Sequence, residues 1–484
     1  MILTLESPVA LEARIATTSR RARVLAITSE LPWPLNTGGH IRTFHLLRSL
    51  AEQFDVRLLT VVEESDVEHL EHLRSVGIDV RAAVVGPRRP WSEAARVASS
   101  AMRGEPYVMY RRHDRGELRR LVQNELARET PDAVYFDHLD PFVFRPLIPK
   151  GVRLIADLHN VYSRLAERVA EEHRGPKKMY LRREAQLLAQ IEQRVASAAD
   201  VVMTVSSEEQ STFRGLGARD VRLIPNGVDC RTYAHLPIGR DVGHVSNVPH
   251  QESGHVENVP HTLLYLGAMS WQPNAKAAEF LAREILPAVR QRFPNARLQL
   301  VGRNPGADVL ALGQLPGVEV AANVPDVGVY LAQATLLAVP LDSGGGTRLK
   351  ILEAFAAGLP VVSTPIGCEG IDATDGEHLW IAPRESFAAA ICDALAHPEA
   401  SRCLAKNARQ LAWDHYDWSA IGREACEAVR RPARQTTPLR VARSRRDRHR
   451  RRAGKNDSQL AEVLEAAGIR LRVRVLASAR RSGL

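Results

Sequence analysis

The stretch PLDSGGGTRLKILEAFAAGLPVVS, residues 340–363, joins the end of one apolar strand pattern to a glycine loop, a helix and a further strand. The run TLLAVPL (335–341) leads into the loop, and Leu349, Leu352 and Phe355 recur at the spacing of one helix face. Strand, loop, helix and strand in this order form one unit of a parallel α/β sheet. Ligands of such sheets bind at the carboxyl ends of the strands, which is where this loop is expected.

The glycine loop has the chemistry of an anion site. Gly345 and Gly346 allow backbone N–H groups to approach a ligand closely. The helix is predicted to begin near Thr347, and its N-terminus adds partial positive charge. Arg348 and Lys350 add formal positive charge in the same turn, so a diphosphate would find both geometry and sign favourable.

Two better-known phosphate loops do not fit this stretch. Lys350 is not placed as in GxxxxGK[ST], and neither half of the chain has GxGxxG after its first strand. A plain turn followed by a Lys350–Glu353 pair on the helix surface stays open as an alternative.

Short β-branched runs alternate with amphipathic helical patterns from residue 23 onward, and the pattern restarts near residue 262. A chain of 484 residues is too long for one ordinary core. We therefore expect an α/β fold of two doubly wound, Rossmann-like domains that face a cleft. The predicted strands cover 23–29, 55–62, 79–85, 132–138, 152–159, 200–206, 221–225, 262–268, 296–302, 318–324, 335–341, 359–364 and 378–383.

The expected domain limits follow from these patterns and from composition. They are a disordered lead (1–22), an N-terminal domain (23–228), a linker with an inserted repeat (229–261), a C-terminal domain (262–415), a closing helix (416–431) and a basic, mostly disordered tail (432–484). The turn IPNGVD (224–229) is expected to act as a hinge between the domains.

A second glycine turn follows the first strand. Gly38 and Gly39 open the predicted helix after Thr37, and an N-cap by Thr37 would by itself explain this turn. A glycine turn at the ligand edge of each domain predicts a phosphate gripped from both sides. His138 and His159 close two neighbouring strands of the first sheet, which places both imidazoles at that same edge.

The net charge of +9 is unevenly placed. The tail is strongly basic, but a nucleic-acid-binding role would rest on that tail alone and is not favoured. A second basic cluster, 110–123, is either a solvated helix surface or a face turned to an anionic membrane.

Cysteine and histidine usage favours neither disulfides nor a metal site. The five cysteines are scattered without CxxC spacing, which favours a reducing, cytoplasmic compartment. The near-repeat GHVSNVPH, GHVENVPH within 243–261 brings four histidines together. No carboxylate or cysteine pattern accompanies them, so we expect an expanded, disordered interdomain loop.

Four stretches in one chain resemble family-4-type retaining glycosyltransferases of the GT-B fold, of the bacterial cell-surface or exopolysaccharide type. They are TGGHIRTFHLLRSLA, VSSEEQSTFRGLGARDVRLIPNGVD, LLYLGAMSWQPNAKAAEFLAREILPAVRQRFPNARLQLVGRNP and GGGTRLKILEAFAAGLPVVSTPIGCEGI. The similarity covers about residues 23–430 in order, apart from the 243–261 insertion.

The resemblance implies roles for several residues. The Gly38–Gly39 turn matches the N-domain loop that contacts the donor diphosphate. His138 matches the histidine placed beside the donor sugar, with His159 as a second candidate. Glu353 matches the C-terminal acid of the family's paired-Glu motif, which binds the nucleotide ribose. Donor phosphates and sugar would be flanked by Gly345, Gly346, Thr347 and Arg348, with Lys350, Lys276 and Asp342 as further donor-binding candidates.

The chain departs from the family pattern in two places. The first Glu of the paired motif lies eight positions before the second, where this chain has Gly345; Asp342 lies close but out of register. The Arg/Lys pair after the first strand of the second domain is reduced to Lys276, so Arg348 and Lys350 are expected to supply that charge.

The implied activity is transfer of a sugar from a nucleotide-diphosphate sugar to a glycan or lipid-linked acceptor in cell-surface polysaccharide synthesis. The resemblance implies retention of configuration and no metal or other cofactor, with stabilisation of the leaving diphosphate by backbone N–H groups and cations. The acceptor suggests contact with the cytoplasmic membrane face. A GT-B UDP-sugar epimerase and a non-catalytic nucleotide-sugar-binding protein are the alternatives.

Overall fold

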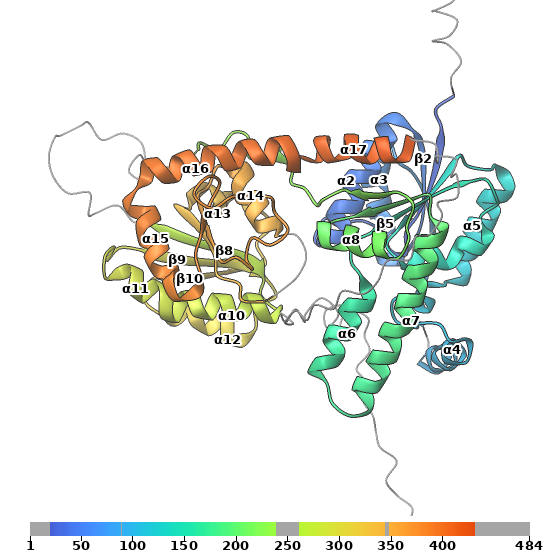
Figure 1. Cartoon of the computed structure of the whole chain (residues 1–484), viewed down its shortest axis with the longest axis horizontal. Helices are drawn as coiled ribbons and strands as arrows, with labels where there is room; N and C mark the ends of the chain where they lie inside the picture. Colours follow the sequence, from blue (N-terminus) through green and yellow to red (C-terminus); the bar gives the residue numbers. More distant parts are fainter. Residues whose placement is uncertain (1–19, 89, 239–260, 344–347, 431–484) are drawn as a thin grey trace, which may run out of the picture.

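The computed structural model describes residues 20–88, 90–238, 261–343 and 348–430 (Figure 1). Several expectations fall outside these ranges: residues 1–19 of the lead, almost all of the GHVxNVPH repeat, and the tail. Gly345, Gly346 and Thr347 of the glycine loop also lie outside the described residues. In the part of the chain that is described, no helix is both long and apolar enough to cross a bilayer.

The first domain is built on a seven-stranded sheet in the order β3-β2-β1-β4-β5-β6-β7, with every neighbouring pair parallel. Its strands are β1 (Arg23–Ile27), β2 (Asp55–Val62), β3 (Asp79–Val84), β4 (Ala133–Asp137), β5 (Arg153–Leu158), β6 (Val201–Thr204) and β7 (Val221–Leu223).

Helices connect these strands, as parallel pairing requires. They are α2 (Gly38–Gln53), η1 (Glu64–His69), α3 (Leu70–Ser75), α4 (Pro90–Arg103), η2 (Arg111–His113), α5 (Gly116–Arg128), η3 (Asp140–Leu147), α6 (Tyr162–Glu172), α7 (Pro176–Ala198), α8 (Ser207–Gly215) and α9 (Cys230–Tyr233). Alternate residues of β1 enter two separate apolar clusters: Leu25 and Ile27 join one, Val24 and Ala26 the other. Both faces of the sheet are therefore covered, as in a doubly wound fold.

The second domain repeats the plan with six parallel strands in the order β10-β9-β8-β11-β12-β13. The strands are β8 (Thr262–Ala268), β9 (Arg297–Arg303), β10 (Val318–Ala322), β11 (Leu336–Val339), β12 (Val361–Ser363) and β13 (Trp380–Ile381). The helices that follow β8 in the chain are α10 (Gln272–Phe280), η5 (Leu281–Ile285), α11 (Leu286–Arg290), α12 (Ala307–Ala311), η6 (Leu312–Gln314), α13 (Gly328–Gln333), α14 (Leu349–Ala357), η7 (Arg384–Ser386), α15 (Phe387–Ala396), α16 (Pro398–Leu411), η8 (Ala412–Tyr416) and α17 (Trp418–Arg430), the last of which packs on the first domain.

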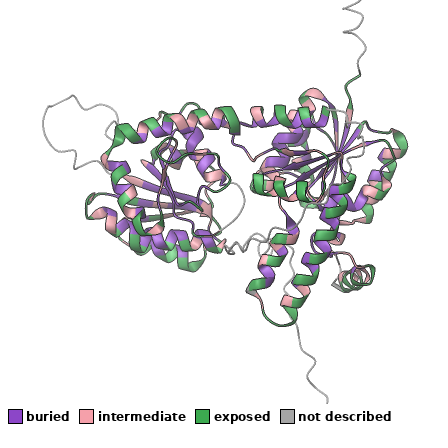
Figure 2. Ribbon diagram, in the orientation of Figure 1, coloured by how far each residue is buried: buried purple, intermediate pink, exposed green. Residues whose placement is uncertain are grey.

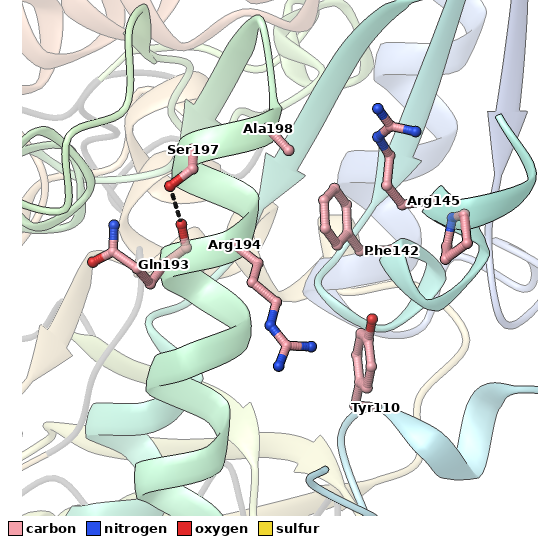
Figure 3. A pocket seen from close by; sticks show the side chains of 8 residues that line it. Tyr110, Phe142, Arg145, Gln193, Arg194, Ser197 and Ala198 are labelled. Carbon is pink, nitrogen blue, oxygen red and sulfur yellow. Dashed lines mark hydrogen bonds between the residues drawn. The ribbon is translucent and has the colours of Figure 1, made fainter. Parts of the chain in front are cut away.

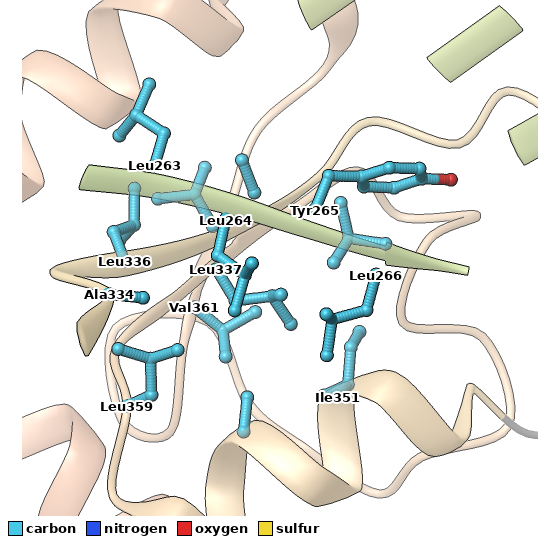
Figure 4. Close-up of a cluster of buried hydrophobic side chains, with 14 of the residues drawn as sticks. Leu263, Leu264, Tyr265, Leu266, Ala334, Leu336, Leu337, Ile351, Leu359 and Val361 are labelled. Atoms are coloured by element: carbon cyan, nitrogen blue, oxygen red, sulfur yellow. The ribbon is translucent and has the colours of Figure 1, made fainter. Parts of the chain in front are cut away.

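The core of this second sheet explains where α14 lies. Leu264 of β8, Leu337 of β11 and Val361 of β12 form a buried apolar layer against which Ile351 packs (Figure 4). Because Ile351 and Leu352 are both fully buried, the first turn of α14 is fixed on the sheet. The N-terminus of α14 is thereby held at the carboxyl edge of β11.

The chain crosses between the domains twice, and the two crossings are hydrogen-bonded to each other. Val228 N donates to Tyr416 O over 2.8 Å, and Trp418 N donates to Val228 O over 3.2 Å. Cys230 N donates to the Asp417 carboxylate over 3.1 Å. After this crossing α17 returns to the first domain and packs against α2 (Figure 1).

All thirteen predicted strands are present. Two differ at an end that matters: β4 stops at Asp137 and β5 at Leu158, so His138 and His159 follow their strands. His138 has φ of 72°, a left-handed backbone that ends a strand.

Candidate functional site

The start of α2 brings the first glycine turn to the strand-end histidines. Thr37 caps the helix by accepting a hydrogen bond from His40 N over 3.2 Å. A β-carbon on Gly39 would lie 3.5 Å from His138 Nε2 and 3.9 Å from His159 Nδ1. Both imidazoles therefore lie next to the N-terminus of α2.

His138 is oriented by the residue before it. Its Nδ1 lies 3.1 Å from an oxygen of Asp137, and the same carboxylate accepts a hydrogen bond from Thr43 Oγ1 over 2.9 Å. Asp137 is buried, which disfavours its charge, but His138 and His159 outweigh burial and hold the pKa of Asp137 below its usual range. The second ring nitrogen of His138 is the one nearest Gly39.

His159 is held beneath this pair by two carboxylates. Its Nε2 lies 3.2 Å from Asp137 Oδ1 and 3.3 Å from Asp157 Oδ2. The ring centroids of His138 and His159 are 3.6 Å apart. Burial opposes protonation of His159, but Asp157 and Asp137 outweigh it and raise the pKa of this imidazole. His159 is itself buried, so it supports His138 from the protein side.

Asp157 is fixed in turn by a buried arginine. Arg42 of α2 makes a two-pronged ion pair with it, Nη2–Oδ1 2.6 Å and Nε–Oδ2 3.0 Å. Tyr135 Oη donates to the same carboxylate over 2.6 Å. Arg42 Nη1 also donates to Ile224 O over 2.7 Å, so α2, β5 and the 224–229 turn are joined at one point.

Asp137, His138 and His159 are the group whose spacing could hold a metal ion among the described residues, with one ligand atom from each within 4.8 Å of the others. The Asp137 carboxylate and one ring nitrogen of each histidine are already hydrogen-bonded to one another or to Thr43 and Asp157. A metal would have to replace these bonds, so the residues fit a hydrogen-bonded relay better than a coordination sphere.

Further titratable groups surround His138. Asp140 is buried at the start of η3, 3.5 Å from His113 Nδ1, and burial raises the pKa of its carboxyl to about 7. Glu30 lies 3.3 Å from His40 Nε2. Sequence reasoning missed all four residues, because they come from four separate segments and only the fold brings them to this edge.

In the second domain, Arg348 immediately precedes α14 and is buried. Its Nη2 donates to Ile366 O over 3.3 Å, in the loop that follows β12. Burial lowers the pKa of this guanidinium. Arg348 therefore lies at the carboxyl edge of the second sheet, where it was expected.

Lys350 has an unexpected partner. Its Nζ donates to Asn274 Oδ1 over 2.9 Å and lies 4.2 Å from the centre of the Tyr265 ring. Tyr265 Oη donates to the same amide oxygen over 2.7 Å. A β-carbon on Gly267 would lie 2.6 Å from Asn274 Nδ2, so glycine makes room for this amide. Burial and the neighbouring Arg348 charge lower the pKa of Lys350 to about 7.

Glu353 lies one turn further along α14 and is half-buried. Burial raises the pKa of its carboxyl to about 7, against the opposing effect of Lys350. Among the described residues it has no hydrogen-bond partner, and no ion pair joins it to Lys350. The alternative of a Lys350–Glu353 pair on the helix surface is therefore wrong, because Lys350 turns to Asn274 instead.

Two other candidates are exposed. Lys276 is exposed on α10, two residues after Asn274. Asp342 is exposed and pairs with Arg384 over 3.2 Å. Arg348 and Lys350 place two cations at the start of α14, and their role in place of Lys276 stays a prediction.

The two half-sites meet directly. A β-carbon on Gly38 would lie 3.6 Å from Leu349 Cδ1. The N-terminus of α2, with His138 beside it, therefore faces the N-terminus of α14, with Arg348 and Lys350. Both helices direct free N–H groups and positive dipole ends toward the region between the domains.

A pocket of about 410 Å³ lies elsewhere in the first domain and contains none of the expected site residues (Figure 3). Arg145 and Phe142 of η3 face Arg194 of α7 across it, with Tyr110 closing one end.

Comparison with known proteins agrees with this architecture. The family "Glycosyltransferase Family 4" matches residues 36–232, and "Glycosyl transferases group 1" matches residues 260–397. A search of curated proteins found no match to the sequence.

Solved structures share the fold over most of this chain. HepE of Anabaena, solved with UDP-glucose, is 15% identical with a TM-score of 0.54 over 84% of this chain and 99% of its own. Sucrose-phosphate synthase of Thermosynechococcus elongatus is 19% identical with a TM-score of 0.58, and the match covers 85% of this chain and 98% of its own. WaaG, a glycosyltransferase involved in lipopolysaccharide biosynthesis, is 17% identical with a TM-score of 0.54, and the match covers 84% of this chain and 99% of its own. At these identities the likeness concerns the fold.

Two parallel-sheet domains with facing helix N-termini, each matched by a glycosyltransferase family, define a glycosyltransferase of the GT-B fold. The chain belongs to the family-4-type glycosyltransferases, in which the reaction is sugar transfer from a nucleotide-activated donor.

Proposed function

We propose that the chain is a retaining glycosyltransferase that moves a hexose from a nucleotide-diphosphate sugar to a glycan or lipid-linked acceptor in cell-surface polysaccharide synthesis. The observation that carries the proposal is the meeting of α2 and α14 at Gly38 and Leu349. A diphosphate bound there would contact two helix N-termini and the cations Arg348 and Lys350, and the His138 imidazole would lie beside the sugar. HepE, solved with UDP-glucose, and WaaG, which acts in lipopolysaccharide biosynthesis, support the donor and acceptor classes.

The donor contacts are assigned to residues of both domains. Arg348 and Lys350 bind the diphosphate, and the Gly38–Gly39 amides bind it from the other side. Glu353, unpartnered among the described residues, accepts hydrogen bonds from the ribose hydroxyls. Gly345, Gly346, Thr347, Asp342, Lys276 and His159 remain candidates from sequence.

In the proposed reaction the bond from the anomeric carbon to the diphosphate oxygen breaks, and its electron pair leaves with the diphosphate. The acceptor oxygen bonds to the anomeric carbon from the same face, and its proton passes to the leaving phosphate oxygen. Protein cations and N–H groups stabilise the charge on the diphosphate, so no metal is required. His138 Nε2 forms a hydrogen bond with a hydroxyl of the sugar, while Asp137 holds the ring through Nδ1.

A screen of UDP-, GDP- and ADP-sugars tests the donor by thermal stabilisation and by release of free nucleotide. Lys350→Met should reduce the stabilisation, whereas Lys406→Met, an exposed lysine on α16, should leave it unchanged. No stabilisation by any nucleotide sugar would overturn the proposal. Stabilisation without turnover would indicate a binding protein, and an epimerised sugar formed without acceptor would indicate an epimerase. Proton NMR of the product gives the anomeric configuration: a β-linked product from an α-linked donor contradicts retention.

A further inference from the structure

Helix α4 presents its apolar side outward. The residues of α4 classed as exposed, apart from Arg103 at its end, are all apolar: Trp91, Ala94, Ala95, Val97, Ala98, Ala101 and Met102. Trp91, Ala95, Ala98 and Met102 recur every three or four residues and form one stripe about 16 Å long. Trp91 is 69% exposed and Met102 is 83% exposed.

The polar side of α4 faces the protein. Arg96 Nη2 donates to Arg111 O over 2.9 Å and to Asp114 O over 2.8 Å. Ser100 Oγ donates to Glu105 O over 2.7 Å, and Glu93 pairs with Arg88 over 3.2 Å. A surface helix ordinarily buries its apolar stripe and exposes its polar one. In α4 this arrangement is reversed, and the hydrogen bonds and ion pair of its polar side hold it in this orientation.

The first turn of α7 also exposes an apolar side chain, and α7 is hydrogen-bonded to the end of α4. Arg183 Nη2 donates to Ala101 O over 2.9 Å, which joins α7 to the end of α4, next to Met102. Met179 precedes Arg183 by one helical turn and is 74% exposed. In Figure 1, α4 stands beside α7 at the margin of the first domain, away from α14. Exposed and intermediate residues dominate α4 in Figure 2.

Cations border this surface. The segment RGPKKMYLRR (174–183) carries five Lys or Arg and no acid. Arg103, Arg174 and Lys177 are exposed and form no ion pair within the described ranges. Two neighbouring carboxylates are paired: Glu93 with Arg88, and Glu171 with Lys178 and Arg182.

We propose that the α4 surface, formed by Trp91, Ala94, Ala95, Val97, Ala98, Ala101, Met102 and Met179, lies in the interface of an anionic lipid bilayer. An apolar stripe with a tryptophan at one end and flanking lysines and arginines is the pattern of an interfacial helix. The apolar side chains enter the headgroup boundary, and the cations bind lipid phosphates.

Charge favours lipid over other occupants. A second copy of the chain would bring the same cations against themselves. The tail 432–484 is also strongly basic and would be repelled in the same way. An anionic surface is attracted by all of these groups.

The surface differs from the basic cluster expected to face a membrane, residues 110–123. In that cluster, Arg111 pairs with Glu105 and Asp114, and Arg119 pairs with Asp114. Those pairs neutralise much of its charge.

The full chain is mixed with vesicles of phosphatidylglycerol and phosphatidylcholine in equal parts, and hydrogen exchange is followed by peptide. We expect protection of residues 90–103 and 174–183, with much less on pure phosphatidylcholine. Trp91→Ser with Met102→Ser should weaken vesicle binding by at least about tenfold. Val67→Ser with Leu310→Ser removes two exposed apolar residues elsewhere and should leave binding unchanged.

Several results would overturn the proposal. They are absence of binding, equal binding by the α4 variant, or protection confined to 432–484. Protection of 90–103 that appears without vesicles and grows with protein concentration would assign the surface to a second copy. Neither donor nor acceptor is present, so the outcome is independent of the proposed transfer activity.

Discussion

Gly38 of α2 and Leu349 of α14 face each other across the boundary between the two domains, with 3.6 Å between a β-carbon built on Gly38 and Leu349 Cδ1. The residues are 311 positions apart in sequence. This proximity places the N-termini of the two helices against each other, together with the charged and imidazole groups of both domains.

His138 should matter for rate more than for folding. His138→Asn removes the imidazole, and asparagine tolerates the left-handed backbone at φ of 72°. We expect kcat to fall by about 10²–10³-fold because a hydrogen bond to the reacting sugar is lost. The melting temperature should change little. Steady-state kinetics on the acceptor reaction provide the measurement, with His415→Asn, an exposed histidine of η8, as control. A variant with full kcat would remove His138 from the mechanism.

Donor binding should take up a proton through Lys350. The pKa of its ammonium is lowered to about 7 by burial and by Arg348, and a bound diphosphate favours the charged form. Donor affinity should therefore weaken as pH rises above 7. Calorimetry at pH 8 in buffers of different ionisation enthalpy measures the proton uptake.

Glu353 should release a proton on donor binding, whereas Lys350 takes one up, so the two contributions can be distinguished. Ribose hydroxyls that donate to its carboxylate would lower its pKa and release a proton near pH 6–7. Lys350→Met should abolish uptake at pH 8, and Glu353→Gln should retain it. Equal uptake in both variants contradicts the assignment of Lys350 to the phosphate.

Glu353→Gln should stabilise the protein without donor at neutral pH. Burial raises the pKa of Glu353 to about 7, so the folded state binds more protons than the unfolded state between about pH 4.5 and 7. The wild type therefore loses stability as pH rises through that window, and the glutamine variant does not. Urea unfolding at pH 5 and at pH 8 should show a gain for the variant only at pH 8. A gain of the same size at both pH values would mean that ionisation is not the cause.

The Arg42–Asp157 pair should be needed for stability. Arg42→Met leaves a fully buried carboxylate without its cation and should cost about 3–5 kcal/mol in the free energy of unfolding. Arg42→Met with Asp157→Asn should recover part of this loss, because the buried carboxylate charge is removed together with its partner. Arg74→Met, which breaks an exposed pair with Glu71, should cost under about 1 kcal/mol. Additive effects at positions 42 and 157 in urea unfolding would show that the pair does not act as a unit.

Much of the site could be located from sequence, because parallel strands place their carboxyl ends at one edge. This reasoning put His138, His159, Gly38 and Gly39 at one end of the first sheet, and the α14 residues at one end of the second. The relay beneath His138 had a visible signal that was not used: YFDH (135–138) and IADLH (155–159) each place an aspartate just before the histidine. The Lys350 partner had none, since Asn274 and Lys350 are 76 residues apart.

The alternation of strands and helices, the restart of the pattern and the glycine turns typical of phosphate binding could all be predicted from the sequence alone. These features are local, since they depend on residue periods of about two and 3.6 and on the backbone freedom of glycine. Which polar groups pair depends on the tertiary structure, as in Arg42 with Asp157 or Lys350 with Asn274. It also decided which side of α4 is covered. A periodic pattern shows that a helix has two faces, but which face is buried depends on partners that come from distant parts of the chain.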